Sequence, residues 1–327
     1  MMYTRWNTYT SFLKARYGSS VYRIGVDGGF SCPNRMKDRS GGCAFCDGTG
    51  AIAAYQRSLE SSFTRSSLFD SFVSSSVIQR SDSIRSQIEK GREFLVKRYK
   101  AEKFLLYFQS WTNTYDSVEN LKRIYDAALS AMPFAGLVVS TRPDSVPEPV
   151  LRLLEDYRKD IDVYLELGLQ SSNDSTLRRI GRGHDAACYL DAAERCHSHG
   201  LEISTHVILG LPGESRDDFI STIRTVNRAR SEAIKIHNLH VAGGTRLYND
   251  YLEGLFTVSS EARHLENTEM ALRHLDPGIV VQRLVCDTPM HRLAAPRHFP
   301  DKSLFLSHLQ QRMEKNGTMQ GDLYIEA

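Results

Sequence analysis

The 327-residue sequence has little that would assign it to a membrane, a disulfide-rich or a disordered class of protein. Its longest apolar runs, such as residues 134–139, are far shorter than the roughly 20 residues of a membrane helix. Arg5, Lys14 and Arg16 interrupt the N-terminus, where a signal peptide would be apolar. Six cysteines are too few for a disulfide scaffold in a chain of this length. We therefore expect a soluble, cytoplasmic, globular protein with no membrane partner.

Neither sign of charge dominates the sequence. The chain has 41 Lys and Arg against 39 Asp and Glu, a net charge of +2, so it has no overall attraction to nucleic acid. Basic residues gather locally in the stretches 80–103, 178–184 and 291–315. With the aromatic residues near them in the sequence, these stretches could bind phosphates and stack bases, or they could be ordinary solvated faces.

Strand-like and helical segments alternate along most of the chain. Six nearly continuous apolar runs read as strands: 21–26, 104–109, 136–141, 163–169, 202–209 and 233–240. No G-x-G-x-x-G motif follows the first of them, which argues against a dinucleotide-binding sheet. The pattern predicts an α/β fold, a partial (β/α)6 TIM-like barrel.

The repeat fades after about residue 245, which suggests three parts. We expect an N-terminal extension over 1–20, the barrel over 21–245 with a serine-rich excursion at 58–86, and a C-terminal extension over 246–327. The last part reads as helices plus one strand at 279–285 packed on the barrel.

Three of the cysteines lie together in one loop after the first strand. Cys32, Cys43 and Cys46 could supply three thiolates to a cubane iron–sulfur cluster, leaving one iron open to another ligand. A structural zinc site needs four ligands, and no second Cys-x2-Cys pair is present. A zinc site completed by a distant histidine and a loop of incidental buried thiols remain as alternatives. Cys188 and Cys196, eight residues apart on one helix, read as ordinary small side chains.

The segment Cys43-Ala44-Phe45-Cys46 resembles the second half of the Cys-x3-Cys-x-aromatic-Cys motif of the radical S-adenosylmethionine (SAM) superfamily. Here the first gap has ten residues, as in the branch that includes the radical SAM subunit of Elongator. The resemblance implies a [4Fe-4S] cluster held by the three cysteines, with SAM on the open iron. It also implies reductive cleavage of SAM to a 5′-deoxyadenosyl radical, with an electron from a donor such as flavodoxin or ferredoxin.

Further motifs of the superfamily follow at the strand ends. They are Tyr107–Tyr115, Ser140–Asp144, Glu166–Ser171 continuing to Arg182, and His206–Glu214. The resemblance implies that these and Phe45 contribute the SAM contacts Phe45, Gln109, Ser110, Ser140, Arg142, Glu166, Gln170, Arg182, His206 and Gly210. Ser140 departs from the pattern, because a glutamate often contacts the ribose at that position.

Two of these residues also have plain structural explanations. Arg142, before Pro143, could form an ordinary salt bridge. Glu166 lies within an apolar strand, where an unpaired carboxylate is costly, so it needs a partner. We expect Arg142 or Arg182 to serve.

Over nearly the whole chain, the sequence resembles a bacterial branch of the superfamily, the YhcC/YtqA-like radical SAM proteins. The residues that carry this resemblance are Asn7–Tyr9, Cys32–Arg35, Phe108–Tyr115 and Ala295–Arg297. The resemblance implies tRNA as partner and a change to the C5 side chain of its wobble uridine 34.

The substrate side of the site is less defined by the sequence. His237, His240 and Cys286 are candidates for catalytic residues at the ends of late strands. For the two histidines a satisfied core side chain is an equal interpretation, and for Cys286 an ordinary side chain is the favoured one. Two other functions remain open: a radical SAM enzyme acting on a small metabolite or peptide, and a non-catalytic iron–sulfur or zinc protein that binds nucleic acid.

Overall fold

The computed structural model describes residues 4–35, 41–47, 77–286, 288 and 290–326. Most of the predicted serine-rich excursion, up to residue 76, therefore lies outside the described residues. Its last part, residues 77–86, belongs to helix α4 (Val77–Tyr99), in which Ile84 and Ile88 are buried.

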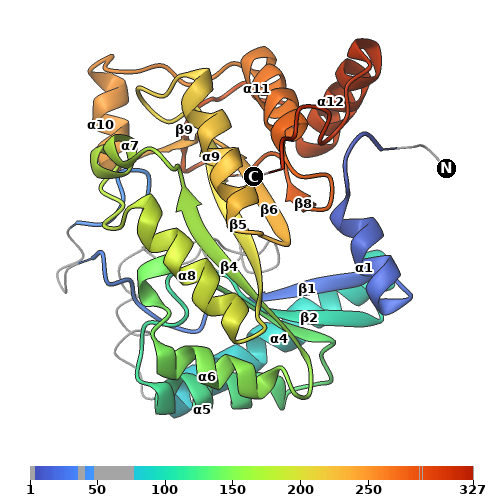
Figure 1. The fold of residues 1–327 in the computed structure, drawn as a ribbon. Coiled ribbons are helices and arrows are strands. Elements are labelled where there is room, and N and C mark those ends of the chain that lie inside the picture. The colour runs from blue at the N-terminus through green and yellow to red at the C-terminus, as the bar shows by residue number, and fades with distance from the viewer. Residues whose placement is uncertain (1–3, 36–40, 48–76, 287, 289, 327) are drawn as a thin grey trace.

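A curled sheet of seven parallel strands forms the centre of the protein (Figure 1). In sheet order the strands are β1 (Val21–Val26), β2 (Lys103–Phe108), β3 (Gly136–Thr141), β4 (Asp162–Gln170), β5 (Glu202–Leu209), β6 (Ala233–Asn238) and β8 (Val280–Arg283). The first six are the strands that the sequence predicts. The seventh is the late strand expected near 279–285, and it extends the sheet by pairing with β6. The predicted partial α/β barrel is confirmed.

Helices lie around the sheet, and most of them cover its outer face (Figure 1). The helices are α1 (Tyr9–Tyr17), α4, α5 (Val118–Leu129), α6 (Glu148–Tyr157), α7 (Asp174–Arg179), α8 (Ala186–Ser198), α9 (Arg216–Arg228), α10 (Arg246–Leu252), α11 (Glu261–His274) and α12 (Lys302–Asn316). Alternation along the strands explains this packing: in β2, Phe104, Leu106 and Phe108 join the large outer core, whereas Leu105 and Tyr107 face inward.

The N-terminal end of the barrel interior is closed by α1. Leu13 of this helix packs against inward-facing residues that include Leu105 and Tyr164. Arg16 holds the helix in place through ion pairs with Asp162 at 2.8 Å and Glu202 at 2.6 Å. The interior is therefore filled at this end, and a site has to lie toward the carboxyl ends of the strands.

A two-stranded ribbon that the sequence did not predict lies at the carboxyl edge. It pairs β7 (Val241–Ala242) with β9 (Leu293–Ala295). A second apolar cluster joins the ribbon to α7, α10 and the cysteine loop. The ribbon thus ties the C-terminal part of the chain to the edge where the motifs end.

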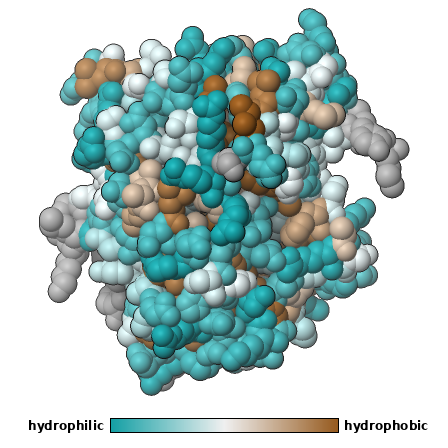
Figure 2. Space-filling view, viewed as in Figure 1, coloured by the Kyte–Doolittle hydropathy of each residue, from teal (hydrophilic) through white to brown (hydrophobic). Residues whose placement is uncertain are grey.

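No helix within the described ranges has the length and apolar character of a membrane span. The face shown in Figure 2 is mostly hydrophilic, with apolar side chains in small groups.

Candidate radical SAM site

The cysteine loop lies at the carboxyl edge of the sheet, directly after β1. Its backbone is anchored at Ala44, the residue after Cys43. The Ala44 amide donates to the Ile180 carbonyl at 2.7 Å, and the Ala44 carbonyl accepts from the Leu247 amide at 3.0 Å. Because Ile180 follows α7 and Leu247 lies in α10, two distant segments fix the position of the loop.

Cationic and amide groups surround the thiols of this loop. Arg182 Nη1 lies 3.4 Å and Asn34 Nδ2 lies 3.5 Å from Cys43 Sγ. Burial alone would raise the pKa of the Cys43 thiol, but Arg182, Arg142 and the Asn34 contact hold that pKa below its usual value. Arg35 Nη2 donates to the Cys46 carbonyl at 2.9 Å and lies 3.5 Å from its Sγ. The surroundings of Cys43 therefore favour its thiolate, the form in which cysteine binds metal.

These residues fit an anionic iron–sulfur cluster, because arginines lie beside the thiols of Cys43 and Cys46. Thiolates spaced around a loop and flanked by arginines suit a larger group that carries negative charge.

A bulge in β4 places two of the predicted SAM contacts side by side. The pairing register with β5 shifts between Gly168 and Gln170, and Gln170 adopts φ +73°, which is uncommon for a residue other than glycine. Arg182 Nη2 donates to the Gly168 carbonyl at 2.6 Å. A Cβ on Gly168 would lie 2.6 Å from both Arg182 Nη2 and Gln170 Nε2, so only glycine leaves room for both side chains.

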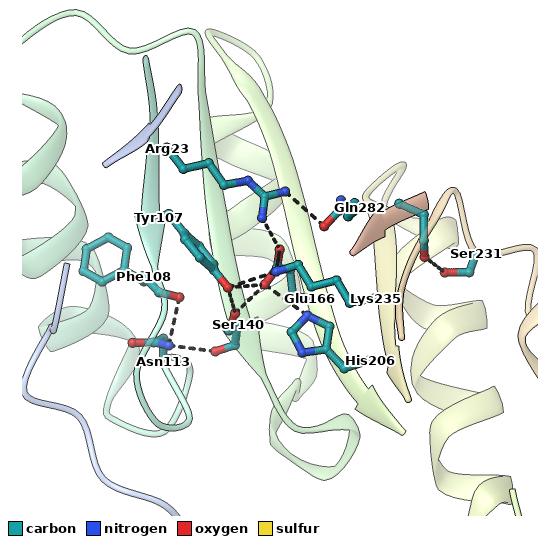
Figure 3. A network of polar contacts seen from close by, with 11 residues as sticks. Arg23, Tyr107, Phe108, Asn113, Ser140, Glu166, His206, Ser231, Lys235 and Gln282 are labelled. Atoms are coloured by element: carbon teal, nitrogen blue, oxygen red, sulfur yellow. Dashed lines mark hydrogen bonds and ion pairs between the residues drawn. The ribbon is translucent and has the colours of Figure 1, made fainter. Parts of the chain in front are cut away.

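Inside the barrel, polar side chains from every strand of the sheet meet on its inner face (Figure 3). We call them the interior polar layer: Arg23, Tyr107, Ser140, Glu166, His206, Lys235 and Gln282. Glu166, with no exposed side-chain surface, is its centre. The five donors to its carboxylate are Tyr107 (2.6 Å), Ser140 (2.7 Å), His206 (3.1 Å), Arg23 (3.0 Å) and Lys235 (2.5 Å).

The expected partners of Glu166 are therefore wrong. Arg182 bonds to Gly168, and Arg142 pairs with Asp144 at 2.6 Å, the salt bridge that the sequence left open. Lys235 and Arg23 take their place, because both point inward, from β6 and β1. The sequence analysis missed both, although each is a charged residue within an apolar strand, the same signal that identified Glu166.

Ser140 and His206, two predicted ribose contacts, belong to this layer and are oriented by Glu166. Burial and the nearby Lys235 lower the pKa of His206 to about 4, so its ring is neutral at pH 7. A neutral ring that donates from Nε2 to Glu166 has its tautomer and orientation fixed.

The three catalytic candidates lie around the end of β6. The ring of His237 lies 5.6 Å from that of His206, next to the interior polar layer. His240 and Cys286 lie farther along and share a partner: Asn238 contacts His240 Nε2 at 2.9 Å and Cys286 Sγ at 3.2 Å. Their contacts are with neighbouring protein groups.

The remaining predicted residues are spread along the carboxyl edge. Gln109 directly follows β2, and its backbone amide donates to the Val26 carbonyl. Ser110, the next residue, is buried. Phe45 packs partly buried in the apolar cluster under α7 and α10. Gly210 begins the loop before α9, where Ser215 and Asp218 form a capping box. This loop lines a pocket of ≈ 750 Å³ that includes Glu214.

The buried carboxyl of Glu214 should make the stability of the folded protein depend on pH. Burial raises its pKa to about 7, even though Ser171 and Thr176 donate hydrogen bonds. The fold thus binds this proton more tightly than the unfolded chain does, and stability falls as the pH rises from about 5 to about 7. Glu214→Gln should match the wild type at pH 5 and exceed it by about 1–3 kcal/mol at pH 8. Thermal midpoints at both pH values test this, and an unchanged difference between the two proteins would contradict it.

Comparisons with known proteins agree with this geometry. The family model of the radical SAM superfamily matches residues 32–226, and that of the radical SAM C-terminal domain matches residues 231–315. YhcC of Escherichia coli strain K12 is 33% identical over 314 residues, covering 95% of this chain and 93% of YhcC. YtqA of Bacillus subtilis is 28% identical over 323 residues, covering 98% and 93%.

Solved structures share the fold. An archaeal Elp3 from Methanocaldococcus infernus matches with a TM-score of 0.62 and 21% identity, over 73% of this chain and 59% of the Elp3 chain. Methylornithine synthase (PylB) matches with a TM-score of 0.52 and 12% identity, over 94% and 85%. The family match spans more than half of this chain and the predicted fold is present, so the protein belongs to the radical SAM superfamily and is an enzyme that uses a [4Fe-4S] cluster and SAM.

Proposed function

We propose that Cys32, Cys43 and Cys46 hold the [4Fe-4S] cluster and that the enzyme modifies the C5 side chain of the wobble uridine 34 of tRNA. The anchored loop at the carboxyl edge, with arginines beside its thiols, is the observation that carries the cluster site. When bound, the cluster supplies the low-potential electron that cleaves SAM. Flavodoxin or ferredoxin in the cytoplasm would provide that electron.

The residues of this chain would then divide the remaining work. Arg182 and Gln170, side by side at the β4 bulge, would hold the amino-acid part of SAM and its ribose. His206 and Ser140, oriented by Glu166, would face the ribose, and Gln109, Ser110, Phe45 and Gly210 would complete the binding surface. Arg142 neutralises thiolate charge beside Cys32 and Cys43. These groups bind and orient, and they exclude water from the reacting atoms.

Support for tRNA as the substrate comes from relatives and from exposed arginines near the cysteine loop. A tRNA-2-methylthio-N(6)-dimethylallyladenosine synthase of Alkalilimnicola ehrlichii is 41% identical over 78 residues, 23% of this chain. On α7, close to the cysteine loop, Arg178 and Arg179 are exposed and form no ion pair within the described residues. Arg246 and Arg297 add exposed cations on the neighbouring α10 and after β9. Arg182, counted with this group from the sequence, is buried and serves the cysteine loop instead.

The exposed arginines of α7 lead us to expect a salt-dependent contribution to RNA binding. The double variant Arg178→Ala/Arg179→Ala should weaken binding to bulk tRNA and lower the slope of log K against log salt by about 1–2, because each phosphate contact releases counterions. The matched control is Arg152→Ala/Lys159→Ala, in α6 and in the turn that follows it, where both cations pair with acidic neighbours. An equal loss in both proteins would contradict a phosphate-binding role of α7.

The substrate itself is tested in a deletion strain. Nucleoside mass spectrometry of its tRNA should show an altered wobble uridine that is restored by the wild-type gene and not by Cys43→Ala. Unchanged wobble nucleosides would overturn the tRNA proposal and favour a small metabolite or peptide as substrate.

A further inference from the structure

The edge strand β8 contributes two neighbouring side chains to the inner face of the sheet. Ile234 pairs with Val281 and Lys235 with Arg283, so the register shifts by one residue at this point. Gln282, the extra residue, bonds to the inward-facing Arg23 at 3.0 Å. Arg283, in register with the inward-facing Lys235, lies on the same side. Such a bulge re-aims side chains, and here it adds a cation to the interior.

With Arg283, the interior holds more basic than acidic side chains. Arg23, Lys235 and Arg283 face the interior, and Glu166 is the single acidic side chain of the interior polar layer. All of Glu166's acceptor capacity is used by its five donors. Arg283 makes no hydrogen bond or ion pair with any described residue. Glu166 serves Arg23 and Lys235, and Arg283 has no counter-ion of its own among the described residues. A cation beside other cations is costly at low dielectric, so the group is suited to an anion that arrives from outside.

His237 adds an independent observation at the same place. Its Nε2 is buried and contacts no hydrogen-bonding partner in the described part of the chain, an unusual condition for a buried polar atom. Burial, followed by the nearby charge of Arg283, holds the pKa of His237 well below its usual value. The ring is therefore neutral at pH 7, and Nε2 can donate one hydrogen bond when it carries the ring proton.

The group is reachable from the carboxyl side of the sheet. Arg283 and His237 are each partly exposed, whereas the opposite end of the interior is filled by α1 and its apolar contacts. Arg182, the arginine proposed for SAM, is occupied at the β4 bulge by Gly168 and Cys43. Arg283 is thus a separate cation on the β6–β8 side of the interior.

We propose that Arg283, together with His237 and with Lys235 beneath them, binds an anionic group of the substrate, a carboxylate or a phosphate. This inference rests on the proposed function in one respect, that the substrate enters the inner face of the barrel. It adds the requirement that the part of the substrate lying there carries negative charge.

Arginine modification tests the proposal without knowledge of the substrate. Reconstituted holoenzyme is treated anaerobically with phenylglyoxal, and the modification rate of Arg283 is followed by peptide mass spectrometry. Parallel samples contain sodium acetate, sodium phosphate or sodium chloride at one ionic strength. The control is Arg230, an exposed arginine paired with Glu194. We expect acetate or phosphate to slow modification of Arg283 about tenfold relative to chloride, as mass action predicts near saturation, with Arg230 unaffected.

The anion that protects identifies the chemistry: acetate indicates a carboxylate and phosphate a phosphoryl group. His237→Phe should lose most of the protection, and His237→Gln, which keeps a donor, should retain it. Equal rates in all three salts would overturn the proposal, and so would protection by SAM alone with no effect of acetate or phosphate. Full protection in His237→Phe would remove His237 from the site. Protection by small anions together with unchanged wobble nucleosides in the deletion strain would leave this site standing and refute only tRNA as the substrate.

Discussion

Replacing Cys43 with alanine should abolish the broad visible absorbance of the reconstituted cluster and reduce SAM cleavage to the level of a protein-free blank. Cys43 is the most deeply embedded thiol of its loop, with Arg182 and Asn34 within 3.5 Å of its sulfur. Its removal takes away a thiolate that these groups stabilise and leaves their charge without a counterpart. Iron content per chain and the yield of 5′-deoxyadenosine measure the two effects.

The matched control is Cys188→Ala. Cys188 lies in the first turn of α8, and partial burial raises the pKa of its thiol, the opposite of the shift at Cys43. This variant should keep both the absorbance and the cleavage. If Cys43→Ala retained its iron, or if both variants lost it equally, the assignment of the cysteine loop would be wrong.

The second large effect concerns stability. Lys235→Met should destabilise the protein by about 3–5 kcal/mol, because it leaves the buried Glu166 without the cation that lies 2.5 Å from its Oε1. This corresponds to a fall of roughly 5–15 °C in the thermal midpoint of the anaerobic protein. Thermal scans of wild type and variant at one scan rate provide the measurement.

A double-mutant cycle separates the pair from general damage to packing. Glu166→Gln combined with Lys235→Met removes both charges while keeping similar volumes. The double variant should be more stable than the sum of the single effects predicts, by at least about 1 kcal/mol, since neither partner is left charged and unpaired. Strict additivity would show that Glu166 and Lys235 do not act as a pair.

Much of the fold could be predicted from local patterns. The strands at 21–26, 136–141 and 202–209 coincide with β1, β3 and β5, because each is a continuous apolar run with turn residues nearby. Family membership could also be predicted, because the cysteine loop and the later motifs have fixed residue types and spacing.

Contacts between distant residues could not be predicted in this way. A charge inside an apolar strand shows that a partner is needed, but it does not say which one, and Lys235 lies 69 residues from Glu166. The ribbon of β7 and β9 has two and three residues, too few for any periodicity to show. The bulge that turns Arg283 inward depends on how β8 pairs with β6, which no local pattern records.

The most direct test of the account is anaerobic reconstitution of the wild-type protein, followed by incubation with SAM and dithionite. Metal analysis and chromatography then report iron per chain and 5′-deoxyadenosine in one sample. The account predicts about four irons per chain, as in a [4Fe-4S] cluster, and 5′-deoxyadenosine formed only with reductant. One zinc per chain without 5′-deoxyadenosine would contradict it and favour a non-catalytic metal protein.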